Sequence, residues 1–205
     1  MSGRAGAVDA LVAAVSVALD DPSLADERVR CESMRPAMAA LLAAPAPIPG
    51  WAHEPLPDGS AVGNLLHADP EGRFHVLAVV FPEGTSSGVH HHGCWGVIGY
   101  LRGGDEETRY VPAAGVDDSA SSAVSLDASS RHVWHQGDIT YLLPSTGESW
   151  HRVRNPGPGV GVSIHVLCRS PAEHPHRFWD RSTGAVLPFP FVEVAPDRWR
   201  ATLGG

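Results

Sequence analysis

From residue 50 onward the sequence is a series of short segments rich in β-branched and aromatic residues, separated by clusters of Gly, Pro, Asp and Asn. Many short strands with frequent turn signals predict a β-sandwich or barrel. The polar, small-residue stretch 113–130 between two of the segments is predicted to be a long surface loop. The predicted strands are FHVLAVVF (74–81), WGVIGYL (95–101), TRYVP (108–112), HVWH (132–135), DITYLL (138–143), WHRVRN (150–155) and VGVSIHVLC (160–168).

The first 50 residues have a different pattern. Apolar residues recur at helical spacing over 6–20, for example Leu11, Val12 and Val15, and a second helix is predicted over 24–44. The stretch APAPIPG at 44–50 ends that helix, because proline cannot continue its hydrogen-bond ladder. We therefore expect one domain over 1–205, with N-terminal helices in 1–50 leading into a β-barrel over 51–195.

Composition excludes several classes of function. A hydrophobic fraction of 43%, a charged fraction of 19% and a net charge of −8 are typical of a soluble globular protein and argue against a nucleic-acid-binding surface. No run of about 18 apolar residues is present to span a membrane. Asp9 interrupts the apolar N-terminal stretch, and no convincing signal-peptidase site follows it. Three cysteines without CxxC spacing indicate reduced thiols, so we expect a cytoplasmic protein.

The stretch GVHHHGC contains the clearest candidate for a metal site. Side chains alternate between the two faces of a strand, so His90 and His92 point one way and His91 the other. Residues two apart lie about 6.6 Å apart along a strand, close enough for two imidazoles to lean onto one ion. The alternative is a histidine-rich turn that binds nothing.

Metal-binding jelly-roll barrels often continue such a pair with a Glu a few residues later and a His on a later strand. Here the run 93–98 contains no carboxylate, and the next one is Asp105. His151, in SWHRVRNPGPG, is available as a distant third ligand. Three neutral imidazoles would leave a divalent ion its full charge and up to three open positions, which suits joint binding of substrate and O₂. Cys94 is a further possible ligand, but its position beside Trp95 is equally explained by core packing.

Four stretches of this chain resemble the cysteine dioxygenase family of thiol dioxygenases, within the cupin superfamily. The resemblance covers roughly residues 60–180 and is closest to the bacterial branch that includes 3-mercaptopropionate dioxygenases. That branch typically shows H-x-H-x-x-W-G-V-x-G, which the chain matches from His90 to Gly99. The stretches are NLLHADPEGRF (64–74), SSGVHHHGCWGVIGYLRG (86–103), HRVRN (151–155) and SIHVLC (163–168).

The resemblance implies a cupin-type double-stranded β-helix in which His90, His92 and His151 bind Fe(II). It also implies that Ser163 and His165 belong to a Ser-His-Tyr relay beside the iron. The tyrosine of that relay falls on Leu167, which cannot donate a hydrogen bond. Either another hydroxyl, such as that of Tyr100 or Tyr141, takes its place, or the chemistry differs.

Substrate recognition also departs from the family pattern. The carboxylate-binding Arg or Gln of the family falls on Asn64, a short neutral amide, whose alternative role is that of a turn residue before a strand. Arg177 could supply a cation instead. Trp95 is expected to shape the pocket beside the site, or to belong to the core.

These residues predict an iron-dependent dioxygenase that converts a small thiol and O₂ to a sulfinate, acting as a monomer or homodimer. Two alternatives remain: a non-catalytic metal-binding cupin or sensor, and a cupin enzyme that uses another divalent metal as Lewis acid. Ser163 and His165 could also be ordinary core residues. The other histidines are predicted to be structural or solvated: His53, His67, His75, His132, His135, His174 and His176.

Overall fold

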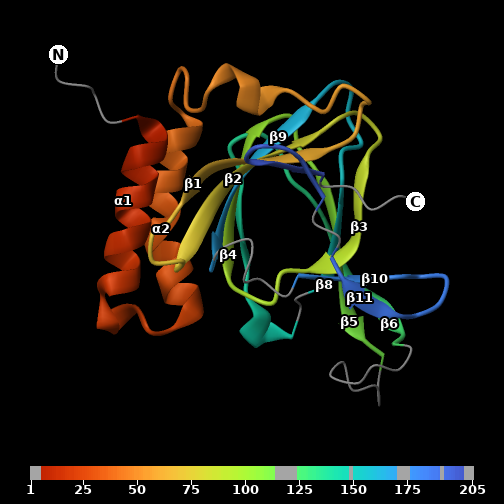
Figure 1. Ribbon diagram of the computed structural model, residues 1–205. Coiled ribbons are helices and arrows are strands. Elements are labelled where there is room, and N and C mark those ends of the chain that lie inside the picture. The colour runs from red at the N-terminus through yellow and green to blue at the C-terminus, as the bar shows by residue number, and fades with distance from the viewer. Residues whose placement is uncertain (1–5, 114–123, 148–149, 170–175, 190–191, 201–205) are drawn as a thin grey trace.

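The computed structural model describes residues 6–113, 124–147, 150–169, 176–189 and 192–200 (Figure 1). Two α-helices come first, α1 (Ala7–Asp20) and α2 (Glu27–Leu42). The strands that follow are β1 (Val62–Ala68), β2 (Phe74–Phe81), β3 (Ser86–His91), β4 (Gly96–Arg102), β5 (Glu106–Pro112), β6 (Leu126–Val133), β7 (Ile139–Leu142), β8 (Trp150–Arg154), β9 (Gly161–Cys168), β10 (Arg177–Trp179), β11 (Val186–Pro188), β12 (Glu193–Ala195) and β13 (Arg198–Arg200).

Two antiparallel sheets form a jelly-roll barrel. One sheet has the order β12-β13-β1-β2-β9-β4-β7 and the other β11-β10-β3-β8-β5-β6. The central eight strands, β2 to β9, therefore divide as β2-β9-β4-β7 and β3-β8-β5-β6. This is the strand order of two interlocked Greek keys, the double-stranded β-helix. The predicted fold class, a mainly β double-stranded β-helix with an N-terminal helical segment, is confirmed.

The helices cover the outer face of the first sheet (Figure 1). The largest hydrophobic cluster joins Leu11 and Val15 of α1, Met34 and Met38 of α2, and outward-facing residues of the sheet such as Ile164. Along β9 the alternate residues Ser163, His165 and Leu167 face the barrel interior instead. The sheet thus presents its aliphatic side to the helices and its histidine to the cavity. No helix among the described residues is long and apolar enough to cross a bilayer.

Five predicted strands, at 74–81, 95–101, 138–143, 150–155 and 160–168, match β2, β4, β7, β8 and β9 to within one residue at each end. The predicted strand 108–112 lies within β5, and the predicted strand 132–135 overlaps β6 only at residues 132 and 133. The segment 74–81 is a strand over its whole length, and the two helices differ from their predicted bounds by three residues or fewer. The prediction of a loop over 113–130 is wrong at its end, because β6 begins at Leu126; residues 114–123 lie outside the described residues. Most side chains of β6 are exposed, so its sequence lacks the apolar alternation that identifies a strand.

Candidate metal centre

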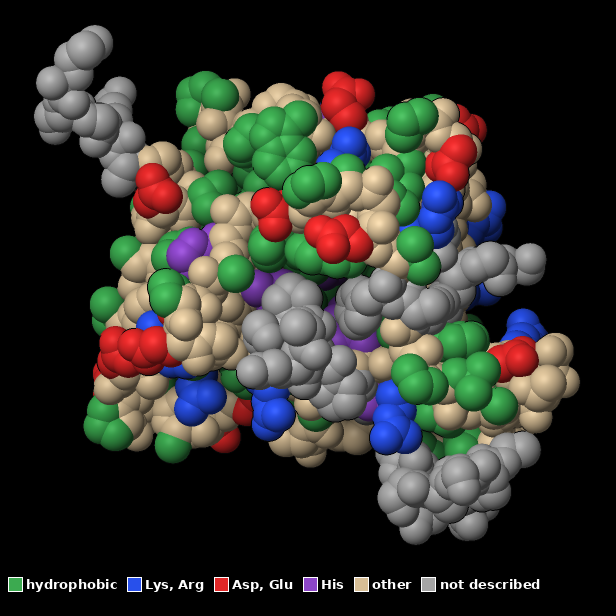
Figure 2. Space-filling view, in the orientation of Figure 1, with side chains coloured by type: hydrophobic (Ala, Val, Ile, Leu, Met, Phe, Trp, Pro, Cys, Tyr) green, Lys and Arg blue, Asp and Glu red, His purple; other side chains and the backbone are tan. Residues whose placement is uncertain are grey.

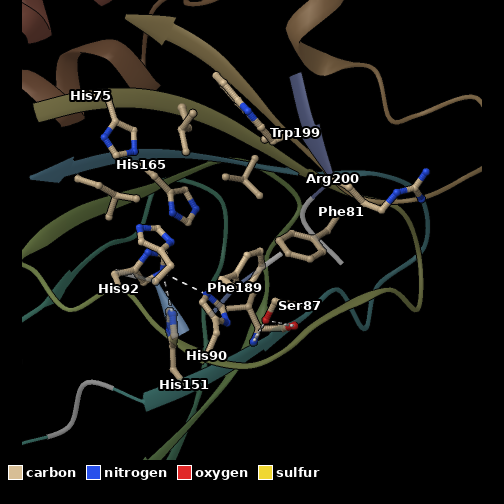
Figure 3. Close-up of a pocket in the computed structure, with 16 residues that line it drawn as sticks. His75, Phe81, Ser87, His90, His92, His151, His165, Phe189, Trp199 and Arg200 are labelled. Atoms are coloured by element: carbon tan, nitrogen blue, oxygen red, sulfur yellow. Dashed lines mark hydrogen bonds between the residues drawn. The ribbon is translucent and has the colours of Figure 1, made fainter. Parts of the chain in front are cut away.

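Three imidazoles meet inside the barrel (Figure 3). His90 lies on β3, His92 follows directly after that strand, and His151 lies on β8, where it is paired in register with His90. The Nε2 atom of His92 lies 3.1 Å from Nε2 of His90 and 3.2 Å from Nε2 of His151. His91 points to the other face, where its ring packs edge-on against Trp150. The structure therefore brings together the three residues predicted to bind the metal.

The geometry of these nitrogens fits a metal ion. Three nitrogens bound at about 2.1 Å to one ion, at angles of about 90–110°, would lie about 3.0–3.4 Å apart. Nδ1 of His151 lies 2.8 Å from Glu107 Oε1 and Nδ1 of His90 lies 3.3 Å from Gly88 O, so both Nδ1 atoms donate and both Nε2 atoms carry lone pairs. These lone pairs converge on His92, whose buried Nδ1 has no hydrogen-bond partner among the described residues. A cation satisfies this arrangement better than a single shared proton.

Burial keeps two of these imidazoles neutral. Removal from solvent, reinforced by the neighbouring imidazoles, holds the pKa of both His90 and His92 well below the ordinary value for histidine. A neutral imidazole is the form that binds a metal. The pocket therefore favours the protonation state that a ligand requires.

A carboxylate supports the third imidazole from behind. Glu107 on β5 is 1% exposed, accepts a hydrogen bond from His151, and accepts another of 3.0 Å from Trp134 Nε1. Burial raises the pKa of Glu107, but the hydrogen bonds from His151 and Trp134 and the charge of Arg109 outweigh this effect and lower the pKa to about 2. The ionised carboxylate fixes the tautomer and orientation of His151, as carboxylates do in carboxylate–histidine–metal triads.

The predicted relay residues lie together on β9. Ser163 Oγ is 2.9 Å from His165 Nε2, and both side chains are buried. His165 lines the same cavity as the three imidazoles, whereas Ser163 lies behind it. Burial, together with nearby His151, lowers the pKa of His165 to about 3. Leu167 also lines the cavity, so a methyl-bearing side chain stands where the family resemblance places a phenol.

The cavity itself is small and mainly apolar, with a volume of about 80 Å³. His75 and His176, both predicted to be structural or solvated, are buried and line it; His75 Nδ1 bonds to Arg169 O, and the His176 ring lies 4.6 Å from that of His92. Figure 2 shows histidine side chains near the middle of this face of the molecule, among apolar ones. His174 lies outside the described residues.

The three residues predicted to bind substrate lie away from the cavity. Asn64 points to the opposite face of β1, where its amide donates to Ala52 O and accepts from Arg198 Nε. Trp95 is part of the core beneath the helices. Arg177 is exposed on β10, opposite the outward-facing His91. None of the three is among the described residues that line the cavity.

Tyr100 and Tyr141 were proposed as substitutes for the missing phenol, but neither is among the described residues that line the cavity. Tyr100 faces the barrel interior, where its ring stacks on Trp134, and Tyr141 packs against the core beneath the helices. The residue that sequence reasoning missed altogether is Glu107. Its only signal was an acidic pair, Glu106–Glu107, inside a short strand, which usually indicates a solvated face.

No protein-family model matches the chain. Its fold is similar to that of an uncharacterized conserved protein with a double-stranded β-helix domain from Klebsiella pneumoniae, with 16% identity, 62% of this chain and 92% of that chain covered, and a TM-score of 0.40. An RmlC-like cupin family protein from Methanocaldococcus jannaschii gives 15% identity, coverage of 58% and 91%, and a TM-score of 0.40. A mutant of Bacillus subtilis oxalate decarboxylase is 15% identical, with 56% of this chain and 27% of that chain covered and a TM-score of 0.38. These similarities concern the fold alone and say nothing of metal, substrate or reaction.

Proposed function

We propose that this chain is a non-heme iron dioxygenase that converts a small thiol and O₂ to the corresponding sulfinate. The observation that carries the proposal is the convergence of three buried imidazole Nε2 atoms in a mainly apolar cavity, with no carboxylate among the three. The resemblance of the sequence around these histidines to bacterial thiol dioxygenases supports the same reaction. In the overall reaction RSH and O₂ give RSO₂⁻ and H⁺, so that both oxygen atoms end on sulfur.

The donor set suits this chemistry. Three neutral ligands leave a divalent ion its whole charge, which favours binding of an anionic thiolate. Fe(II) held by His90, His92 and His151 would supply neighbouring positions for the thiolate and O₂. Glu107 would keep His151 oriented, and the apolar walls would exclude water from the reacting sulfur.

His165 is the proposed hydrogen-bonding group beside the reacting atoms. It lines the cavity, stays neutral because burial depresses its pKa, and is held by Ser163 at 2.9 Å. In this proposal the Ser163–His165 pair orients the bound reactants in the absence of the family's phenol. Ser163 acts through His165 and is therefore a positioning residue.

A second candidate function is metal and thiol binding without turnover. Leu167 in the cavity wall and the engaged amide of Asn64 favour it, because neither the phenol nor the carboxylate-binding group of the family is present at the site. Such a protein would report or store a ligand through the same three histidines.

The test is to purify the protein without oxygen, measure its metal content, and follow O₂ uptake and sulfinate formation with a panel of small thiols. Iron-dependent sulfinate formation supports the dioxygenase. Thiol binding without O₂ uptake supports the second candidate, and thiol-independent activity with zinc or manganese would assign a Lewis-acid enzyme instead.

A matched pair of variants locates the metal site. His151→Ala should lower iron content at least about tenfold, since it removes one of three ligands. His135→Ala, at an exposed turn, should leave iron content unchanged. Equal iron content in the two variants would remove His151 from the site.

A further inference from the structure

The end of the cavity away from His92 and His151 is a continuous apolar wall. Alternate residues of β2, Leu77, Val79 and Phe81, face inward, and Val79 and Phe81 cluster with Val153 of β8. Trp199 of β13 completes this side, as Figure 3 shows. We call Leu77, Val79, Phe81, Val153 and Trp199 the apolar wall.

Apart from the neutral His165, which is paired with Leu77 and is already assigned to the reacting atoms, the polar groups near this wall are Ser87 and Arg200, and both are engaged. The Ser87 hydroxyl donates to Gly88 O at 2.8 Å and accepts from Val153 N at 3.0 Å. Arg200 bonds to Asp58 Oδ2 at 2.9 Å and to Ser60 Oγ, and Figure 3 shows its guanidinium turned away from the imidazoles. Neither group is left to receive a charged part of a ligand.

The cavity offers few permanent cations. The chain contains no lysine, and among the described residues that line the cavity Arg200 is the only arginine. The segments outside the described residues contain one further arginine, Arg4. A carboxylate placed against the apolar wall would therefore lose its water without gaining an unpaired cation, which is strongly unfavourable.

We propose that the substrate is a thiol with a short, uncharged apolar tail, a small alkyl thiol rather than an amino acid or a mercapto acid. Its sulfur meets the three imidazoles and its tail lies against the apolar wall. This inference rests on the proposed function for the identity of the reacting group. The size of the cavity, about 80 Å³, limits the tail to a few carbon atoms. Each methylene buried there should tighten binding about fourfold.

A pair of ligands of the same shape tests the inference. In 3-methylbutane-1-thiol, two methyl groups replace the carboxylate oxygens of 3-mercaptopropionate. Titration calorimetry of the zinc-loaded protein without oxygen should show at least about tenfold tighter binding of the apolar thiol. Equal or tighter binding of 3-mercaptopropionate or cysteine would overturn the inference, as would no binding of either ligand.

Variants of the wall give a second measurement. Phe81→Ala should weaken the binding of 3-methylbutane-1-thiol about 5- to 10-fold. It should change the affinity for ethanethiol less than about twofold, because only the longer tail reaches the apolar wall. Val17→Ala, on the exposed side of α1, is the control and should change neither. Equal losses for the two thiols in Phe81→Ala would contradict the proposed position of the tail.

Oxygen uptake by the iron-loaded protein separates this inference from the proposed function. Preferential binding of the apolar thiol without O₂ uptake would support the inference of an apolar ligand and contradict the proposed dioxygenase activity. Sulfinate formation from cysteine or 3-mercaptopropionate, without turnover of the apolar thiol, would retain the dioxygenase and overturn the inference.

Discussion

At the scale of single residues, the candidate metal centre depends on Glu107, a carboxylate that lies outside the group of three histidines. Glu107 joins His151, Trp134 and Arg109 through hydrogen bonds in the barrel interior. Such outer partners fix the ring orientation and raise the basicity of a histidine ligand. The charge of the carboxylate also compensates part of the charge that an ion would bring into the barrel.

Glu107→Gln keeps the shape of the side chain and removes its charge. We expect metal affinity to fall about 10- to 100-fold, measured by competition with a chromophoric chelator. Glu106→Gln is the control, because Glu106 precedes Glu107 on the same strand and pairs with Arg131 instead. Equal affinities in the two variants would show that Glu107 has no part in positioning His151.

Asp105 is a second buried carboxylate, and its Oδ1 has no hydrogen-bond partner among the described residues. Burial, followed by the charge of Glu107, raises its pKa to about 7. Because the folded value exceeds the unfolded one, Asp105 favours folding below about pH 4 and this contribution is lost as the pH rises through 7. Asp105→Asn should therefore raise the free energy of unfolding by about 1–3 kcal/mol at pH 8 and change it little at pH 4. Urea unfolding at both pH values tests this; equal effects would exclude a titrating Asp105.

At the scale of elements, the connection from β4 to β5 sets the position of Glu107. Asp105 N donates to Trp134 O at 3.1 Å and Trp134 N donates to Asp105 O at 2.8 Å, which fixes the start of β5 against the end of β6. Gly104 directly precedes Asp105, and a Cβ at position 104 would overlap the Trp134 carbonyl oxygen. Position 104 requires a glycine because its backbone lies directly against the backbone of Trp134, which leaves no room for a Cβ.

Gly104→Ala should accordingly lower the free energy of unfolding by about 1–3 kcal/mol, since the contact cannot be relieved by a side-chain rotation. Gly50→Ala is the matched control, because an added Cβ would meet nothing within 4 Å. Denaturant unfolding of both variants measures the difference. A Gly104 variant as stable as the Gly50 variant would mean that the two backbones are farther apart than described.

At the scale of the whole molecule, the barrel encloses histidines that stay uncharged while the unfolded chain would protonate them. The pKa of His90, His92 and His165 is depressed by burial in the folded state. Below the unfolded value of about 6.5 the unfolded chain then binds more protons than the folded one, so acid favours unfolding. Asp105 has the opposite effect on stability in acid, but it is a single group and the three histidines outweigh it.

The free energy of unfolding of the metal-free protein should therefore decrease by at least about 1 kcal/mol per pH unit below pH 6. Urea titrations at pH 7.5, 6.5 and 5.5 with a chelator present would measure the slope. A flat profile, or one that rises toward acid pH, would mean that these imidazoles are accessible to protons in the folded protein.

The sequence was most informative where chemistry and periodicity coincide. The H-x-H spacing predicts that His90 and His92 share a face, and alternation alone accounts for the outward position of His91. The apolar segment of β2 was recognised at its correct length. These inferences need only local geometry.

Tertiary pairing decides what could not be predicted. Glu107 looks like a surface residue until β5 is placed beside β8, and Asn64 looks available for substrate until β1 turns its side chain toward the helices. The exposed strand β6 and the short strands from β10 onward carry little periodic pattern. Among the described residues, Asn64, Trp95 and Arg177 do not line the cavity, and for Asn64 the reason is that one position along a strand changes the face on which a side chain lies.

Phe189 and Trp199, far along the chain, complete a cavity whose group of three histidines begins at His90. During synthesis on the ribosome, the nascent polypeptide therefore exposes these imidazoles long before the residues that enclose them have emerged. If these histidines hold an ion, as proposed, its acquisition in the finished environment must wait until translation has passed residue 199. Loading would then be a late event in the biogenesis of this protein.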